Sequence, residues 1–485
     1  MPYDTLIRDP SLPVAKPTTS YWQTPPHEKL LHVQSAQLPA ECDIAVIGSG
    51  ISACSTVREL LVGGYKGTIA VLEARELCSG ATGRNGGRIH VHAMKDYDAF
   101  RRRFGDDAAK KIVRFQMMHR PAIEAAVKTL RPEHQNRAAL RDTESVAAVF
   151  SEAKLAQTKT LLANFEAAFP DCAGQWRLIS GEEAQKKYKI KNATGAVVHV
   201  AGAAWPYRLI TDTFQELQEK YPDQLSLDSN TPVLRVSKNP APGPGYLVST
   251  PRGTVKAKHV VYCTEAHTAH LLPKLTGIIV PRRGQMTVQR PGQNFEHLAG
   301  KRSFNFNWDQ GHDYLHQNPE TGDLIIGGGE HGGVSGSALT YGQRSDDVEI
   351  LPDKIHLSGL MRVVFGQQDW GEVPAGSHAI KASWSGILGQ SLDHVPLVGL
   401  LPQEALHDRR VGDPEKGAEW IAVGFGGYGM TNCWLSGVAL ARQILGQVVP
   451  EWFPEQFVAS SSRLVRLQDQ VETYGGTERH LRALL

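Results

Sequence analysis

Three side chains that could bind an anion or transfer a proton alternate along GRIHVH, residues 87–92. Arg88, His90 and His92 are spaced two positions apart. Side chains two apart point to the same face of an extended strand, so all three are expected to share one face. A guanidinium group there could bind a carboxylate, and an imidazole could hydrogen-bond a ligand or accept a proton. The alternative is that they bond backbone or domain-interface groups.

The elements before this stretch predict a nucleotide-binding unit. IAVIG (44–48) is a continuous apolar run, typical of a strand buried on both faces of a parallel sheet. The next residues, GSGISA, have the spacing G-x-G-x-x-A. Gly48 permits a tight turn, Gly50 lets the backbone approach a pyrophosphate, and Ala53 lets the following helix pack closely. Apolar residues then recur at helical spacing up to residue 61.

A second apolar strand, TIAVLEAR (68–75), carries Glu73 near its end, 25 positions after Gly48. An acid at about this distance from the turn binds ribose hydroxyls and repels a 2′-phosphate. A chance glycine turn is the alternative. Because strand, turn, helix, strand and acid occur in order, the sequence predicts a bound dinucleotide with an unphosphorylated ribose.

The glycine-rich stretch CSGATGRNGGRIHVH (78–92) favours a flavin over a nicotinamide. A resident cofactor is enclosed along its whole length and needs such a loop, whereas a nicotinamide enzyme rarely has one here. The stretch resembles the D-amino-acid oxidase, glycine oxidase and sarcosine oxidase family of FAD-dependent oxidoreductases, which has a loop like G-A-[ST]-x-x-N-G-G. The matching residues are Gly80, Ala81, Thr82, Arg84, Asn85, Gly86 and Gly87. A flexible glycine loop is the alternative.

Further segments resemble the family in its own order. They are AGAAWPYRLI (201–210), NTPVLRV (230–236), KHVVYCTEAHTAHLL (258–272), VPRRGQMTV (280–288), SWSGILGQSLDHVPLVGLLP (383–402) and IAVGFGGYGMTNCWLSGVALARQIL (421–445). In the family, the helix in the last segment starts beneath the flavin pyrimidine ring. Its N-terminal N–H groups would stabilise the negative charge of the reduced ring.

The motif and the resemblance together assign one set of residues to FAD. The set is Gly48, Gly50, Ile51, Ser52, Glu73, Ala74, Arg75, Gly80, Ala81, Thr82, Arg84, Asn85, Gly86, Gly87, Val233, Thr264, Gly386, Gly427, Tyr428, Gly429, Met430 and Thr431. Three departures limit the resemblance. Glu265 stands where the family usually has a neutral residue. Gly386 stands where sarcosine oxidases have the cysteine that attaches the flavin, so a non-covalent FAD is expected. Neither LIIGGGEHGG (324–333) nor GYGMTN (427–432) supplies the lysine that speeds oxygen reduction in those enzymes.

The catalytic candidates are few, because a flavin that takes a hydride from a neutral amine needs no strong base. Arg88 is predicted to hold a carboxylate, and His90, or less strongly His92, to bond the ring edge or accept a proton. Tyr428 stands where relatives often have His and would place a phenol near the ring, unless it only packs over the turn. Trp384 would form a wall of the pocket or belong to the core. Glu330 and His331 could face the substrate.

The matches imply an α/β fold with a discontinuous Rossmann-like FAD-binding domain at about 38–93, 196–275 and 376–450. Two insertions, 94–195 and 276–375, would form a substrate domain of antiparallel sheet plus helices. The first insertion has mostly helical periodicity and the second is read as strands. Residues 1–37 and 451–485 are read as surface-wrapping extensions, with Trp22 and the Pro25-Pro26 pair as anchors.

Composition excludes several classes of partner. A net charge of +2, from 52 basic and 50 acidic residues with no Lys/Arg block, favours neither nucleic acid nor a lipid surface. Six scattered cysteines show no metal-ligand spacing and fit a reducing compartment. The N-terminus has no signal-peptide core, and no apolar run reaches the ~18 residues of a spanning helix. We therefore expect a soluble intracellular protein, cytoplasmic by default, without a metal. The oligomeric state stays open.

The sequence predicts an FAD-dependent oxidoreductase that oxidises the C–N bond of an amine or amino acid to an imine, with O2 as the second substrate and H2O2 as product. One rival is a flavin dehydrogenase of a 2-hydroxy acid that passes electrons to a quinone or a carrier protein. Another is a non-catalytic flavin-binding subunit of a larger complex. A nicotinamide dehydrogenase is disfavoured by the second glycine loop.

Overall fold

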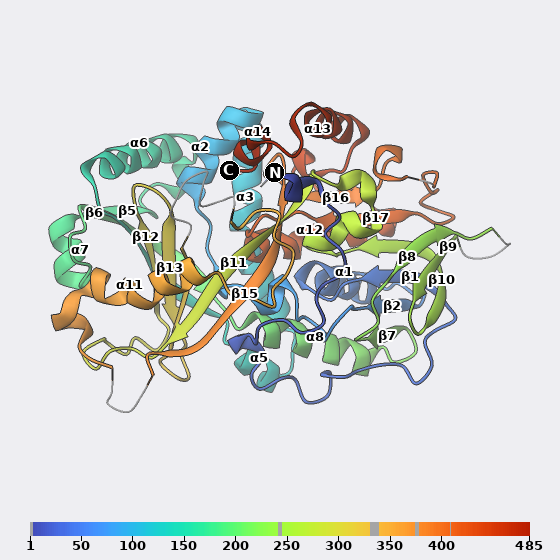
Figure 1. Cartoon of the computed structure of the whole chain (residues 1–485), viewed down its shortest axis with the longest axis horizontal. Coiled ribbons are helices and arrows are strands. Elements are labelled where there is room, and N and C mark those ends of the chain that lie inside the picture. The colour runs from blue at the N-terminus through green and yellow to red at the C-terminus, as the bar shows by residue number, and fades with distance from the viewer. Residues whose placement is uncertain (1–2, 241–244, 330–338, 374–377, 408) are drawn as a thin grey trace.

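Two β-sheets organise the chain (Figure 1). The computed structural model describes residues 3–240, 245–329, 339–373, 378–407 and 409–485. The first sheet lies on the right of Figure 1 and the second on the left. The long strands β11 (Ile279–Gln289) and β15 (Ile380–Ser391), at one edge of the second sheet, run through the middle of the molecule.

The first sheet has the order β16-β17-β10-β1-β2-β7, and β9 and β8 extend it from β10. Strand β1 pairs in parallel with both β2 and β10, as the predicted nucleotide-binding unit requires. Its apolar run is buried on both faces, because Ile44 and Val46 face one core cluster while Ala45 and Ile47 face the other. The strands are β1 (Glu41–Ile47), β2 (Ile69–Leu72), β7 (Leu225–Asp228), β8 (Arg235–Lys238), β9 (Tyr246–Thr250), β10 (Gly253–Tyr262), β16 (Leu397–Leu400) and β17 (Glu419–Val423).

Three helices pack on one face of this sheet, and their apolar residues join the same core cluster as Ile44. They are α1 (Ile51–Val62), α8 (Pro206–Lys220) and α12 (Cys433–Ile444). Helices α1 and α12 cross so closely that only glycine fits at position 437. A Cβ atom there would lie 2.0 Å from Ser55 Oγ. Ser55 Oγ also donates a hydrogen bond of 2.6 Å to Trp434 O. The crossing brings the N-terminal ends of both helices towards one region.

The second sheet has the order β15-β11-β14-β13-β12-β4-β6-β3, with β5 paired to β6. Its pairs are antiparallel except for β4 and β12. The remaining strands are β3 (Arg88–Ile89), β4 (Arg141–Val149), β5 (Arg177–Ser180), β6 (Gly195–Ala203), β12 (Arg302–Asn307), β13 (His312–Gln317) and β14 (Leu324–Gly328). The predicted fold class, a Rossmann-like unit with a second unit of antiparallel sheet plus helices, is confirmed.

The helices between the strands of the second sheet pack on both units, because two of them place Ile123 and Ala138 in the core cluster of the first unit. They are α2 (Ala93–Phe104), α3 (Asp106–Met117), α4 (His119–Val127), α5 (Pro132–Ala138), α6 (Glu152–Ala168), α7 (Gly181–Tyr188) and α11 (Leu351–Trp370). One core cluster contains sheet residue Phe306 with Phe365 of α11, and another contains Val197 with Phe165 of α6. Ser151 caps α6 by accepting from Lys154 N, and Ser180 caps α7 in the same way.

The helical pattern of the first insertion is confirmed by α3, α4 and α6, and the strand pattern of the second by β11 and β14. Helix α11 was not predicted, although Leu357, Leu360, Met361 and Val364 recur at helical spacing and are buried. The domain bounds stay a prediction. The sheets do not divide the chain at those bounds, because β3, β6 and β15 lie in ranges given to the cofactor domain yet pair in the second sheet.

Both end segments pack on the first unit, and the N-terminal one also contacts strand β15 of the second sheet. Trp22 is buried in a core cluster as expected, but Pro25 and Pro26 are exposed and anchor nothing, which corrects the prediction. Short helix α9 (Thr268–Leu271) follows β10, and α13 (Ser461–Tyr474) and α14 (Glu478–Leu484) bury Leu464 and Leu481 in the second core cluster. Among the described residues, no helix has the length and hydropathy needed to cross a bilayer.

Candidate active site

The first glycine turn closes against the neighbouring strand. Gly48 has φ +103°, and a Cβ atom there would lie 2.5 Å from Cys263 O at the end of β10. A Cβ on Gly50 would lie 3.0 Å from Thr82 Oγ1, which also accepts a 3.1 Å hydrogen bond from Ile51 N. Only glycine fits the first position, because both its φ and its neighbour exclude a side chain. The turn brings the start of α1 to a cavity, the first cavity, that Ser49, Gly50 and Ser52 line.

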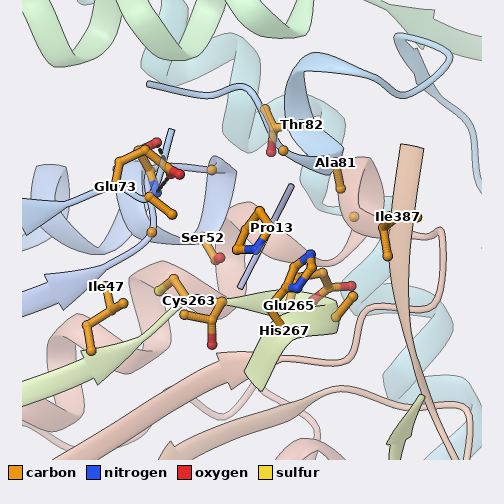
Figure 2. Close-up of a pocket in the computed structure, with 18 of the residues that line it drawn as sticks. Pro13, Ile47, Ser52, Glu73, Ala81, Thr82, Cys263, Glu265, His267 and Ile387 are labelled. Carbon is orange, nitrogen blue, oxygen red and sulfur yellow. Dashed lines mark hydrogen bonds between the residues drawn. The ribbon is translucent and has the colours of Figure 1, made fainter. Parts of the chain in front are cut away.

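Glu73 lies at the end of β2 and lines the first cavity, as predicted (Figure 2). Its carboxylate accepts hydrogen bonds from Ser49 Oγ at 2.6 Å and from Ser49 N and Arg75 N at 3.1 Å each. Ala74 and Val233 line the same end of the cavity. The contacts predicted for these residues with FAD stay predictions, and the acid here also fixes the glycine turn.

The second glycine loop is held by packing on both sides. A Cβ on Gly86 would lie 2.5 Å from the Tyr314 ring, and one on Gly87 would lie 2.7 Å from Ala204 O. Asn85 ties the loop internally, since its Oδ1 accepts from Gly87 N at 2.6 Å and its Nδ2 donates to Thr82 O at 3.0 Å. Gly80, Ala81, Thr82 and Asn85 line the first cavity. Packing, and not flexibility, therefore explains these glycines.

Two arginines assigned to the cofactor form ion pairs and hydrogen bonds with protein groups. Arg75 Nη1 donates to the Asp346 carboxylate at 3.0 Å, and Arg84 Nε forms an ion pair with the same carboxylate at 3.2 Å. Arg84 Nε also donates to Ser385 O at 2.7 Å. Burial lowers the pKa of Arg84 to about 10. Asp346 thus balances both charges at the edge of the first cavity, while the predicted contacts of these two residues with the cofactor stay predictions.

The last glycine turn borders two cavities. Gly426 and Gly427 have φ of +59° and +88° between β17 and α12. Gly427, Gly429 and Met430 line the first cavity, and Tyr428 and Thr431 line a neighbouring one, the second cavity. Five residues belong to both cavities: Ala81, Asn85, Leu388, Gly427 and Met430. A ligand that begins at the first turn can therefore extend past the last one into the second cavity.

Glu265, the unusual acid, lies in the first cavity near this last turn (Figure 2). Its carboxylate accepts hydrogen bonds from Gly424 N at 2.9 Å, Phe425 N at 3.1 Å and Gly389 N at 3.2 Å. Burial raises the pKa of Glu265 to about 7, against the lowering effect of these bonds. The acid joins the turn before α12 to strand β15. Thr264, the preceding residue, also lines the cavity.

The second cavity contains the three alternating side chains. Arg88, His90 and His92 all line it, together with His312, Tyr314 and Tyr428. The ring centroids of His90 and His92 are 4.5 Å apart, and His199 lies 4.9 Å from His90. Burial lowers the pKa of His90 and His92 well below the usual value and that of His199 and His312 to about 4. These imidazoles are therefore neutral at physiological pH.

Arg88 has unused hydrogen-bonding capacity in this cavity. Its Nη1 donates to Asn305 Oδ1 at 2.8 Å, and its guanidinium carbon lies 5.4 Å from the Tyr314 ring centroid. Nε and Nη2 are buried and have no hydrogen-bond partner within the described part of the chain. Burial lowers the pKa of Arg88 to about 10, so the group stays charged. Two buried donors on a cation favour an anionic ligand.

The other candidates have different positions. Tyr428 lines the second cavity with its ring centroid 6.1 Å from that of His92, and the nearby Asp96 and burial raise its pKa, so the phenol is protonated. Trp384 is fully buried and donates to Arg84 O at 2.8 Å. The core alternative therefore describes Trp384 better than a pocket wall. Gly386 lines the second cavity, and Glu330 and His331 lie outside the described residues.

Comparisons with known proteins identify the chain. A sequence profile described as "FAD dependent oxidoreductase" matches residues 43–443. The chain belongs to this FAD-dependent oxidoreductase family. Glycine oxidase from Geobacillus kaustophilus superposes with a TM-score of 0.64 at 16% identity, covering 87% of this chain and 99% of that one. L-proline dehydrogenase from P. horikoshii gives a TM-score of 0.61 at 20% identity, covering 87% and 98%.

Curated relatives match over short stretches. Gamma-glutamylputrescine oxidoreductase from Escherichia coli is 34% identical over 71 residues, which are 15% of this chain and 16% of that protein. The chain thus aligns with about a sixth of that relative's length.

The family's cofactor, FAD, fits the first cavity. Gly48 lets the turn at the cavity close against Cys263 O, where a Cβ would lie 2.5 Å away, and the N-termini of α1 and α12 both approach the cavity. Helix N-termini carry partial positive charge and free N–H groups that suit a diphosphate or a negatively charged ring. Gly48–Ser52, Glu73, the 80–85 loop and Gly427–Met430 would hold FAD. This agreement confirms the predicted cofactor, while the individual contacts stay predictions.

Sequence reasoning missed several residues of these cavities. His312 and Tyr314 of β13, Asp346, and Leu12 and Pro13 all line one cavity or the other. None of them belongs to a motif. The clearest signal for Tyr314 was the glycine at position 86, which indicates that another residue fills the space of a side chain there. That residue lies 228 positions away, so the sequence alone could not identify it.

Proposed function

We propose that this chain oxidises the C–N bond of an amine that carries a carboxylate, an amino acid, to the imine. The observation that carries the proposal is Arg88, a buried cation whose Nε and Nη2 have no partner among the described residues and whose side chain lines the second cavity. A carboxylate accepts two parallel N–H bonds from a guanidinium group. The second cavity adjoins the first through five shared residues, so a substrate bound there would lie next to the cofactor.

FAD, when bound, accepts the hydride and its two electrons from the substrate carbon. Loss of hydride from a neutral amine leaves an iminium ion, which becomes the imine by releasing a proton. We propose that O2 then takes the two electrons together with two protons and leaves as H2O2. This chain's residues would orient the substrate and control its protonation.

The electrostatics of the second cavity favour a neutral amine. Burial and the charge of Arg88 lower the pKa of His90 and His92, and the same forces act on any ammonium group placed beside them. A substrate amine would therefore lose its proton to solvent on binding. The neutral imidazoles and the protonated Tyr428 phenol would then orient it by hydrogen bonds.

The test is an anaerobic panel in which each compound is scored by loss of flavin absorbance. Matched pairs of amino acids and their decarboxylated amines are included, as are 2-hydroxy acids with the same side chains. We expect reduction by amino acids and much slower reduction by the amines. Reduction by hydroxy acids alone would identify the rival dehydrogenase, and no reduction by any compound would favour the non-catalytic subunit. Reoxidation by O2 is compared with ferricyanide and a quinone.

A further inference from the structure

The N-terminal strap, residues Asp9–Trp22, lies outside the stretch that matches the family, which begins at residue 43. It nevertheless forms part of the first cavity. Leu12 and Pro13 line that cavity together with Gly48, Ser52 and His267 (Figure 2). The cavity wall therefore contains residues that the nucleotide-binding motif does not supply.

One end of the strap is fixed beside α9. The His267 ring nitrogen Nδ1 lies 2.9 Å from Ser11 O, and the Asp9 carboxylate lies 3.1 Å from His270 Nδ1. Burial lowers the pKa of His267 to about 4, so its ring is neutral and Nδ1 can donate to the carbonyl as N–H. His267 and His270 themselves line the first cavity, so this end of the strap is attached to the cavity wall.

The middle of the strap is fixed by Thr18 and Asp346. Thr18 N and Oγ1 donate to Asp346 O at 2.7 and 2.9 Å, and Ser385 N donates to Thr18 Oγ1 at 3.1 Å. Arg84 Nη2 reaches Thr18 Oγ1 at 2.7 Å. Because Arg84 and Arg75 also pair with the Asp346 carboxylate, these groups form one buried cluster, the latch: Thr18, Arg75, Arg84 and Asp346.

The far end of the strap holds the second glycine loop. Ser20 is fully buried, and its Oγ donates to Gly83 O at 2.7 Å. Trp22 Nε1 donates to Asn85 O at 2.5 Å, and a Cβ on Gly87 would lie 2.9 Å from the Trp22 ring. The strap thus contacts the α9 wall, the latch and the loop that is expected to enclose the flavin.

We propose that the strap is a component of the FAD site that retains the cofactor, and that FAD leaves only when the latch opens. Leu12 and Pro13 close the cavity on one side, so a bound cofactor would have to displace them to exit. The latch explains the two arginines in the cofactor motif, whose charges hold the strap and not the diphosphate. The proposal depends on FAD binding and not on the identity of the substrate.

The first experiment measures the rate of FAD release from the holoenzyme by the rise in free-flavin fluorescence after dilution. Thr18→Val keeps the shape of the side chain but removes its hydroxyl, and Thr18 does not line the first cavity. We expect release at least tenfold faster than from the wild type. Thr473→Val is the control, because its hydroxyl donates to Asp469 O on the exposed face of α13; its release rate should not change.

A second measurement needs no variant. Hydrogen–deuterium exchange of the peptide covering residues 9–22 is followed in the wild-type protein with and without added FAD. Exchange should slow at least tenfold with FAD, most clearly at the Thr18 amide, which donates to Asp346 O. Equal exchange in both states, or equal release rates in Thr18→Val and the wild type, would overturn the proposal.

Discussion

Replacing Arg88 by methionine tests the proposed carboxylate site most sharply within the cavity. Methionine keeps part of the side-chain length beside the Tyr314 ring but removes the charge and the two free donors, Nε and Nη2. Removing one partner of a buried, hydrogen-bonded charge pair costs about 2–5 kcal/mol. That range corresponds to a factor of about 30 to 5,000 in affinity or kcat/KM.

The assay is anaerobic stopped-flow reduction of the flavin, with the best amino acid from the panel and its decarboxylated amine. Arg88→Met should lower the limiting slope of reduction rate against concentration by the factor above for the amino acid. It should change the slope for the amine far less, because the amine loses only the effect of the Arg88 charge on its pKa. Arg88→Lys should recover part of the loss, because it restores the charge without the two-pronged geometry.

Arg282→Met is the matched control, since Arg282 lines the same cavity with its guanidinium carbon 5.3 Å from the Tyr341 ring centroid. We expect a smaller loss that does not distinguish the acid from the amine. The reasoning is refuted if Arg88→Met affects both compounds equally, or if Arg282→Met alone removes the preference for the carboxylate.

Three further predictions concern the framework. Gly48→Ala should lower the melting temperature and weaken FAD binding, because φ +103° costs about 1–3 kcal/mol with a side chain and the Cβ would lie 2.5 Å from Cys263 O. Glu265 has a pKa raised to about 7, so the folded state holds its proton more tightly than the unfolded chain and stability falls as pH rises from about 4.5 to about 7. Glu265→Gln should remove about 3 kcal/mol of that fall, seen as a flatter melting temperature over this range. Trp384→Phe should cost about 1–3 kcal/mol in urea unfolding, because it leaves Arg84 O without its 2.8 Å donor.

Matched controls separate each cause. Gly64→Ala tests positive φ alone, because Gly64 has φ +90° and no atom within 4 Å of its Cβ position. Equal losses at positions 48 and 64 would contradict a role for Cys263 O. Burial also raises the pKa of Asp96 to about 7. Asp96 is present in both the wild type and Glu265→Gln, so the difference between their melting temperatures reports Glu265 alone. Trp452→Phe controls for ring size at a half-buried site where the indole N–H has no hydrogen bond to a described residue.

The parts of the site that the sequence predicted are those fixed by local geometry. Gly48 and Gly50 follow a buried strand, and the turn they form depends on a few neighbouring residues. The alternation of Arg88, His90 and His92 correctly indicated one shared cavity, although strand β3 covers only Arg88–Ile89 and His92 has φ −82° and ψ 48°. Glu265 was recognisable as unusual because it interrupts a short motif.

The residues that the sequence did not predict come from distant segments. His312 and Tyr314 reach the second cavity only because β13 pairs with β12 and β14, and nothing in their own sequence indicates that register. Arg75 and Arg84 stand at cofactor-motif positions, but Asp346, more than 250 positions away, determines where their charges point. Trp384 was ambiguous because burial depends on the whole core.

The central claim is that one FAD lies between the first and last glycine turns and is reduced by a substrate whose carboxylate binds Arg88. The most direct measurement is the visible spectrum of the FAD-loaded chain, mixed without oxygen with an amino acid and then with its decarboxylated amine. The account predicts one bound flavin per chain that loses its colour with the acid far faster than with the amine. A chain that binds no FAD, or a flavin bleached equally fast by both compounds, would contradict it.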